Sequence, residues 1–212
     1  MRSEVKVEPH GISPGPQDGL LHYAGFWPRF GAHLLDLLIF VPVIGLSIWI
    51  GEYSRMANIY SYFPWLAFGL WFNVYLVKRY GGTPGKLMLK IRITRLDGSS
   101  VGYREALLRH SVLFVLTTLQ SIGLLVATLS MSDSEYLSLS LQARNLRLVE
   151  TAPSWYQLVG VLMNIWIWGE FVIMLTNKRR RALHDFMAGT IVVRADRSCT
   201  QPALPQVARQ SD

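Results

Sequence analysis

The chain has 212 residues, of which 50% are hydrophobic and 17% are charged, and its mean hydropathy is +0.25. These values exclude an ordinary soluble domain and indicate a protein that crosses a membrane several times. The formal net charge is +7, but Lys and Arg stand beside hydrophobic segments, a pattern typical of membrane topology rather than nucleic-acid binding. The single cysteine, Cys199, excludes an internal disulfide and a cysteine-based metal site.

The two ends of the chain have a different composition from its middle. Residues 1–22 mix Pro, Gly and charge without periodicity, so we expect a disordered cytoplasmic tail, and we expect a second one over residues 196–212. The first hydrophobic run begins late and lacks a small-residue cleavage site, so it is expected to stay as a membrane anchor. Residues 23–195 form the predicted membrane domain.

Four stretches are long and apolar enough to cross a bilayer, whose core takes about 20 residues of helix. The predicted spans cover residues 26–50, 58–77, 107–131 and 155–176. The sequence therefore predicts an all-α membrane protein built as a bundle of four transmembrane helices.

The connection between the second and third spans carries an alternating pattern. Apolar Leu87, Leu89, Ile91 and Ile93 alternate with polar residues up to Asp97-Gly98. This pattern predicts a strand over residues 87–96. A second β-branched run covers residues 190–193, and because an isolated strand is not stable, we expect the two runs to pair as a small cytoplasmic two-stranded element.

Lys and Arg are distributed unevenly among the connections. The 51–57 loop has one and the 133–154 loop has two, whereas residues 78–104 and 177–212 have seven each. Because basic loops stay on the cytoplasmic side, both termini are predicted to be cytoplasmic.

The first span carries three ionisable residues within its first turns. Arg29, His33 and Asp36 are separated by four, three and seven positions, spacings that place them on one face of a helix. An ionised carboxylate in hydrocarbon costs about 2.5 to 3.5 kcal/mol, so Asp36 needs a partner. We expect Arg29 and Asp36 to act as one unit, bridged by His33 or by a group from another helix.

Two acids near the same membrane interface are candidate partners for Arg29. Asp185 follows a basic cluster at residues 178–181, and Glu170 lies near the far end of the fourth span. The set Arg29, His33, Asp36, Asp185 and Glu170 has two interpretations. One is a structural ion pair that fixes the first helix, and the other is an ion-coupling site.

Three strings carry a resemblance to a known family. They are GFWPRFGAHLLDLLI, GGTPGKLMLKIRITRLDG and RRALHDFMAGTIVV, in this order. The chain resembles the RDD family of bacterial membrane proteins over about residues 22–195, with Arg29, Asp36 and Asp185 matching the Arg and the two Asp of its name. The segment 132–154 and the two tails match nothing in that pattern. The resemblance implies a multi-pass inner-membrane protein, and cation/proton exchange has been proposed for the family.

Two classes of function compete. The first is a proton- or cation-coupled transporter in which Asp36 alternates between protonated and cation-paired forms, because a conformational change that separates it from Arg29 would shift its proton affinity. Four helices enclose little volume, so this class predicts a homo-oligomer. The second is a membrane scaffold or regulatory module for a partner protein. The cytoplasmic basic residues predict contact with anionic headgroups in both classes.

An enzyme is not expected. The sequence has no H-E-x-x-H and no G-x-S-x-G, and no residue pattern implies a cofactor or a metal.

Overall fold

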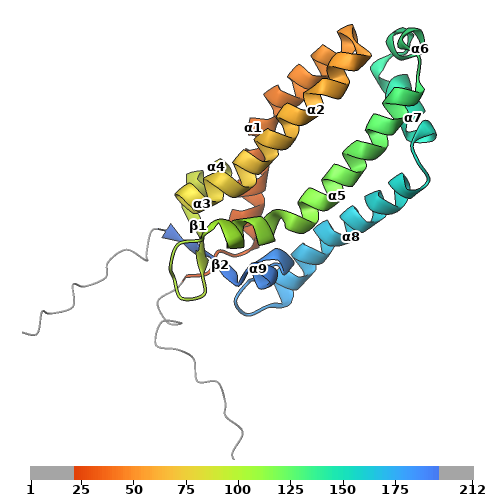
Figure 1. Ribbon diagram of the computed structural model, residues 1–212. Helices are drawn as coiled ribbons and strands as arrows, with labels where there is room; N and C mark the ends of the chain where they lie inside the picture. The colour runs from red at the N-terminus through yellow and green to blue at the C-terminus, as the bar shows by residue number, and fades with distance from the viewer. Residues whose placement is uncertain (1–21, 196–212) are drawn as a thin grey trace, which may run out of the picture.

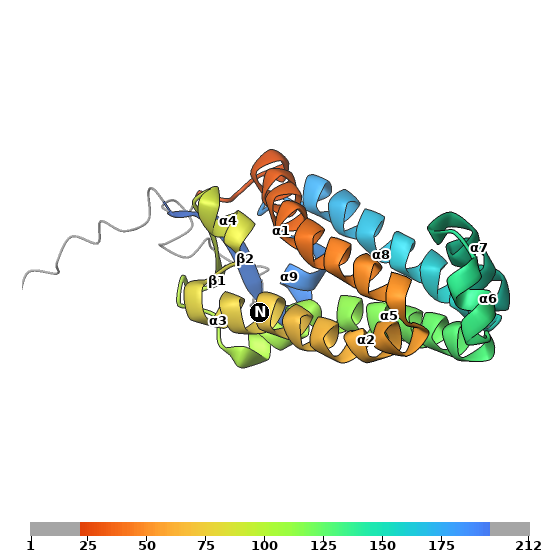
Figure 2. The same cartoon turned by 90° about the horizontal axis from the view of Figure 1, so that it is seen from above.

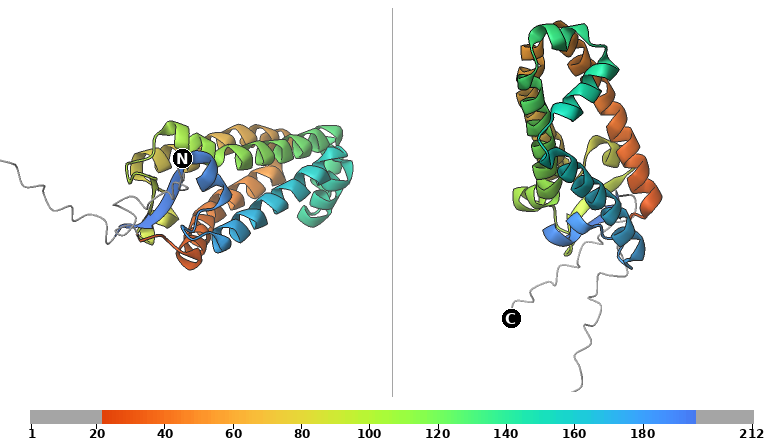
Figure 3. Two further views of the ribbon diagram at one scale, coloured as in Figure 1. Left: turned by 90° about the horizontal axis from the view of Figure 1, so that it is seen from below. Right: turned by 90° about the vertical axis from the view of Figure 1, so that its right-hand side faces the viewer.

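The computed structural model describes residues 22–195 as a bundle of long helices (Figure 1). The short strands lie at one end of the bundle, which we call the sheet end, together with the short helices of residues 76–80, 84–88 and 183–188, and the helices of residues 133–138 and 141–151 lie at the other, the loop end (Figures 1 and 3). In chain order the elements are α1 Phe26–Tyr53, α2 Arg55–Leu70, the π-helical turn η1 Trp71–Tyr75, α3 Leu76–Tyr80, α4 Pro84–Met88, β1 Ile91–Arg95, α5 Tyr103–Ser130, α6 Asp133–Ser138, α7 Leu141–Thr151, α8 Trp155–Thr176, α9 Leu183–Ala188 and β2 Thr190–Arg194.

Three of the described helices, α1, α5 and α8, are long and apolar enough to cross a membrane. Helix α8 has the predicted bounds, α1 extends three residues past its predicted end, and α5 begins four residues before its predicted start. The fourth predicted span, 58–77, falls in the run of α2, η1 and α3, where the π-helical turn interrupts the α-helix. The structure thus establishes three long apolar helices and a fourth, interrupted helical run.

The long helices bury few of their side chains. On α1 the side chains of Leu37 and Leu38 are 54% and 65% exposed, and on α8 Ile165 is 63% exposed. Soluble proteins do not leave contiguous apolar faces of this size open to water. These faces suit contact with lipid.

The two strands pair as the sequence predicts. Strands β1 and β2 are antiparallel, with Ile93 opposite Val192. The predicted start of the first strand is wrong, because residues 84–88 form helix α4 instead. Pro84 occupies the first turn of that helix, where its fixed φ and missing N–H are favourable, and the chain enters β1 only after Lys90, whose φ is +53°.

The segment before α1 runs along β2. Ala24 N donates to Val192 O over 2.8 Å, and Arg194 N donates to His22 O over 2.9 Å. Both ends of the described chain therefore lie at the sheet end. The predicted tails fall outside the described residues, apart from His22.

The loop end is more ordered than the sequence predicted. Helices α6 and α7 replace the expected 133–154 loop, and each begins at a serine whose hydroxyl accepts from a backbone N–H, Ser132 from Glu135 and Ser140 from Ala143. Buried Arg144 of α7 joins the loop end to α1, because its Nη1 lies 2.9 Å from Oε1 of Glu52. The sequence analysis overlooked the two capping serines.

A cysteine crosslink tests the strand register. Ile93 and Val192 face each other but are a non-hydrogen-bonded pair, because Ile93 N donates to Gly81 O and Val192 O accepts from Ala24 N. In such pairs the two Cα atoms are about 4.5 Å apart, which a disulfide can span. In a Cys199→Ser chain, Ile93→Cys with Val192→Cys is expected to oxidise efficiently in membranes. The control pair is Thr94→Cys with Val192→Cys, because these two side chains point to opposite faces of the sheet. Equal crosslinking of the two pairs would contradict this register.

Candidate functional site

Arg29 and Asp36 are both buried, at 4% and 7% exposure, but they have different partners. Arg29 donates to Asp185 Oδ2 over 2.7 Å and to Ala24 O over 3.2 Å. Asp36 accepts from Thr83 and Gly85. The expected contact of Arg29 with Asp185 is present. Arg29 and Asp36 were also expected to form one bridged unit, but each of them binds different groups.

Helix α4 packs beside α1 (Figure 2), and Asp36 holds the start of α4 there. Its Oδ2 accepts from the Thr83 hydroxyl over 2.6 Å and its Oδ1 from Gly85 N over 2.7 Å. A Cβ at position 85 would collide with the Ala32 carbonyl oxygen and would lie 2.8 Å from Asp36 Oδ1. Gly85 is therefore required by the close approach of two backbones, and the Asp36 carboxylate satisfies polar groups that this approach buries.

Asp185 is the centre of the ionic network at the sheet end. Its side chain is 0% exposed and contacts Arg29 from α1 and Arg109 from α5. Its Oδ2 also accepts from Ala182 N over 3.0 Å, which caps the first turn of α9. Burial alone would raise the pKa of Asp185, but Arg109, His184 and Arg29 outweigh burial and hold the pKa below its ordinary value. The carboxylate therefore stays ionised at neutral pH.

Arg109 completes this network, and the sequence analysis did not select it. Its guanidinium contacts both Asp185 Oδ1 and the Thr190 hydroxyl at the start of β2. Arg109 lies inside the predicted third span, so the rule that singled out Asp36, an ionised group within an apolar helix, would have found it.

Glu170 pairs with His184 rather than with Arg29. His184 Nδ1 contacts Glu170 Oε1, and its Nε2 lies 3.6 Å from Asp185 Oδ1. The side chains of His184 and Glu170 are 17% and 22% exposed, whereas Asp185 is fully covered. The network thus has a fully covered part around Asp185 and a partly accessible part, the Glu170–His184 pair.

A small cavity of about 40 Å³ adjoins this network. That volume can hold a few water molecules. Arg29 Nη2 is buried without a hydrogen-bond partner among the described residues. The lining residues come from α1, α4, α5, α8, β2 and α9 with its N-cap: Arg29, His33, Lys86, Arg109, Glu170, Phe171, Met174, Ala182, His184 and Val192.

Lys86 brings a further charge to this cavity. Burial, followed by repulsion from Arg109, lowers the pKa of Lys86 to about 8, and the attraction of Asp36 offsets part of this. Its ammonium lies 3.5 Å from the Thr83 hydroxyl. His33 lines the same cavity but is exposed on the surface of the chain, so it stands at the rim rather than between Arg29 and Asp36.

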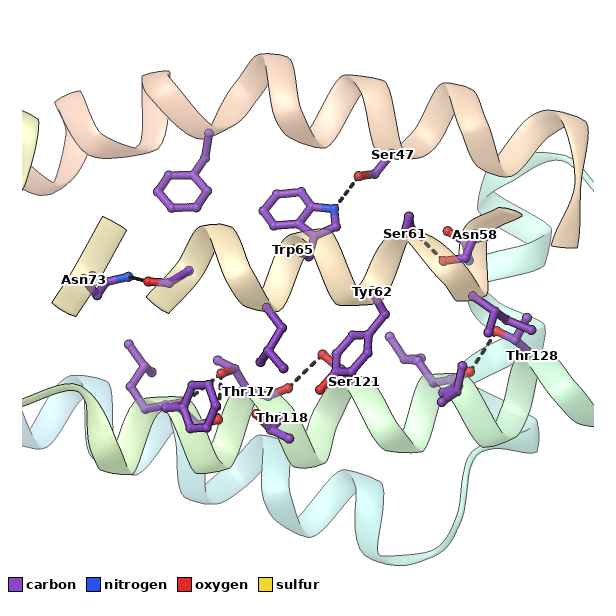
Figure 4. Close-up of a pocket in the computed structure, with 18 of the residues that line it drawn as sticks. Ser47, Asn58, Ser61, Tyr62, Trp65, Asn73, Thr117, Thr118, Ser121 and Thr128 are labelled. Atoms are coloured by element: carbon purple, nitrogen blue, oxygen red, sulfur yellow. Dashed lines mark hydrogen bonds between the residues drawn. The ribbon is translucent and has the colours of Figure 1, made fainter. Parts of the chain in front are cut away.

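A second, larger cavity of about 550 Å³ lies between α1, α2 and α5 (Figure 4). Aromatic rings and hydroxyl or amide side chains line it, and it shares no lining residue with the small cavity. Among residues 22–195, no group of three or more His, Cys, Asp or Glu side chains is placed to hold a metal ion.

Long apolar helices with exposed apolar faces, joined at one end by a buried ionic network, define a multi-pass membrane protein. A sequence profile of the RDD family matches residues 23–189, and the chain therefore belongs to the RDD family. This confirms the resemblance noted in the sequence. No curated protein and no solved structure shows significant similarity to the chain.

The network makes a prediction for stability. Asp185→Asn leaves two buried guanidinium groups without their counter-ion and should lower the free energy of unfolding by about 3 to 5 kcal/mol. Unfolding by SDS titration in mild detergent measures this, with Asp97→Asn, at an exposed turn, as the matched control.

Double-mutant cycles locate the coupling. Arg29→Gln and Asp185→Asn should be non-additive by about 1 to 3 kcal/mol, and Arg29→Gln with Asp36→Asn should be additive within about 0.5 kcal/mol. Additive losses for Arg29 and Asp185 would show that this contact does not stabilise the fold.

Proposed function

We propose that this protein is a proton-coupled cation transporter of the bacterial inner membrane, with the Glu170–His184 pair as its exchange site. The observation that carries the proposal is the partly accessible His–Glu contact, set beside a small cavity and backed by the covered Asp185 network. Ionisable groups inside a membrane domain are costly and mark ion pathways in many transporters.

The exchange step follows from the charges around Glu170. When His184 is protonated, it neutralises Glu170 across their contact. When His184 loses its proton, Glu170 is left as a carboxylate without a counter-charge on that contact, and a small cation can take the place of the proton. Protonated His184 and the cation then compete for the Glu170 carboxylate, and each cation bound displaces the proton of His184. Asp185 keeps its charge throughout, because Arg29 and Arg109 hold it ionised.

Asp36 is not the exchange residue in this proposal. Both Asp36 oxygens accept hydrogen bonds that hold α4 to α1. In the proposal Asp36 and Arg29 are structural, and Glu170 and His184 carry the proton.

In this proposal the chain crosses the membrane four times, as a four-helix bundle, with the run α2–η1–α3 as the fourth span. The backbone stays helical across both joints of that run, so it is continuous from Arg55 to Tyr80. An even number of spans agrees with the pairing of residues 22–24 with β2 at one end. We place the sheet end in the cytoplasm, where residues 178–181 meet anionic headgroups, and the pathway in a homo-oligomer.

One observation favours the alternative, a non-transporting scaffold for a partner protein. Arg29, Arg109, Asp36 and Asp185 are all engaged in contacts that join elements of the fold, which a purely structural role also explains. The proposal includes no catalytic step, no cofactor and no nucleic acid.

Ion flux distinguishes the two functions. Purified protein in liposomes containing a pH-sensitive dye should move protons when Na⁺, K⁺ or Li⁺ is added outside. Glu170→Gln should reduce the rate at least about tenfold, because the neutral amide can neither pair with protonated His184 nor hold a cation in its place.

Glu150→Gln, at an exposed position of α7, is the matched control and should keep the wild-type rate. Wild-type protein that is folded in the liposomes and moves no protons with any of the three cations would overturn transport and favour the scaffold.

A further inference from the structure

The large cavity between α1, α2 and α5 is chemically unlike the ionic network. It runs along the bundle from Asn58 and Thr128 near the loop end to Asn73 toward the sheet end (Figure 4). Of the described residues that line it, none is Asp, Glu, Lys or Arg, and His110 is the single titratable one apart from Tyr62. A charged ligand would find no counter-ion here, at membrane depth, so the cavity suits an uncharged one.

The hydroxyl groups of the cavity are arranged mainly as acceptors. Thr117, Ser121 and Thr128 donate to carbonyl oxygens one turn earlier on α5, over 2.8, 2.9 and 2.8 Å. Their oxygen lone pairs remain available to a ligand that donates a hydrogen bond.

Two further hydroxyls have no hydrogen-bond partner within residues 22–195. Tyr62 Oη and Thr118 Oγ1 are buried, and neither makes a hydrogen bond among the described residues. Figure 4 shows Tyr62 reaching from α2 toward Ser121 on α5. Burying a hydroxyl without a partner is unfavourable, and a ligand that both donates and accepts a hydrogen bond would recover this loss.

Aromatic rings form the apolar part of the lining. Phe40 and Trp65 are nearly parallel, with centroids 6.1 Å apart and planes at 15°, and Trp65 Nε1 donates to Ser47. The π-helical turn η1 places Asn73 on the same cavity, and such turns occur frequently at functional sites. The volume of about 550 Å³ lies in the range of small-molecule pockets.

We propose that this cavity binds an uncharged aromatic molecule that carries a hydroxyl group, of the phenol class. The ring packs against Phe40 and Trp65, and the hydroxyl donates to an α5 hydroxyl oxygen while accepting from Tyr62. This site goes beyond the proposed exchange at Glu170, and neither depends on the other.

Fluorescence quenching tests the site. The full-length chain in nanodiscs at neutral pH is titrated with 4-bromophenol, whose bromine quenches tryptophan on contact. A saturable component is expected above the linear rise caused by partition into lipid. Trp65→Phe should remove most of that component, and Tyr62→Phe should weaken binding about threefold to tenfold, the effect of losing one hydrogen bond.

A matched glycine pair provides the control. A side chain at Gly69 would enter the cavity, whereas Gly45 does not line it, and a Cβ at either position meets no atom within 4 Å. Gly69→Leu should abolish the saturable component and Gly45→Leu should keep it.

Three results would overturn the proposal. The first is the absence of a saturable component in folded wild-type protein. The second is equally tight binding of 4-bromotoluene, which would identify a non-selective apolar groove of the kind an acyl chain fills. The third is equally tight binding of 4-bromobenzoate, which would show that the site does not select uncharged molecules. Because the measurement involves no ion flux, its outcome is independent of transport.

Discussion

The contact of Asp185 with Arg29 and Arg109 holds the sheet end together. These three residues come from α9, α1 and α5, and Arg109 also contacts Thr190 at the start of β2. Each charge is costly in a membrane domain, and each is tolerated because the others compensate it. The charges compensate one another only when the three helices and the sheet are all in place. The network therefore favours this one arrangement of the four elements.

The packing of the bundle follows from this arrangement. Buried apolar clusters lie at the two ends, around Ile93 and Val192 at the sheet end and around Met131 and Tyr136 at the loop end. Between them, α2 and α5 are separated by the large cavity. The buried clusters thus lie at the two ends and the cavity in the middle, and the partly accessible Glu170–His184 pair borders the Asp185 network.

Hydrophobic length and alternation predicted most of the fold, since α8 and the β1–β2 pairing follow directly from them. The partners of Asp36 could not be predicted, because they are a threonine hydroxyl and a backbone N–H that only the docking of α4 brings near. Helical spacing placed Arg29 and Asp36 on one face but carried no information on which neighbour each would meet. The Arg29–Asp185 contact was predictable because both charges had to lie at one interface, where each needed a counter-ion.

Competition between protonated His184 and a cation for the Glu170 carboxylate can be measured as proton release when the cation is added. Detergent-solubilised protein in weakly buffered solution with a pH dye is mixed with NaCl, KCl or LiCl, and choline chloride corrects for ionic strength. The account predicts that one of the three cations releases protons saturably from the wild type and from Asp36→Asn, but not from Glu170→Gln. Saturable release that is unchanged in Glu170→Gln would contradict it.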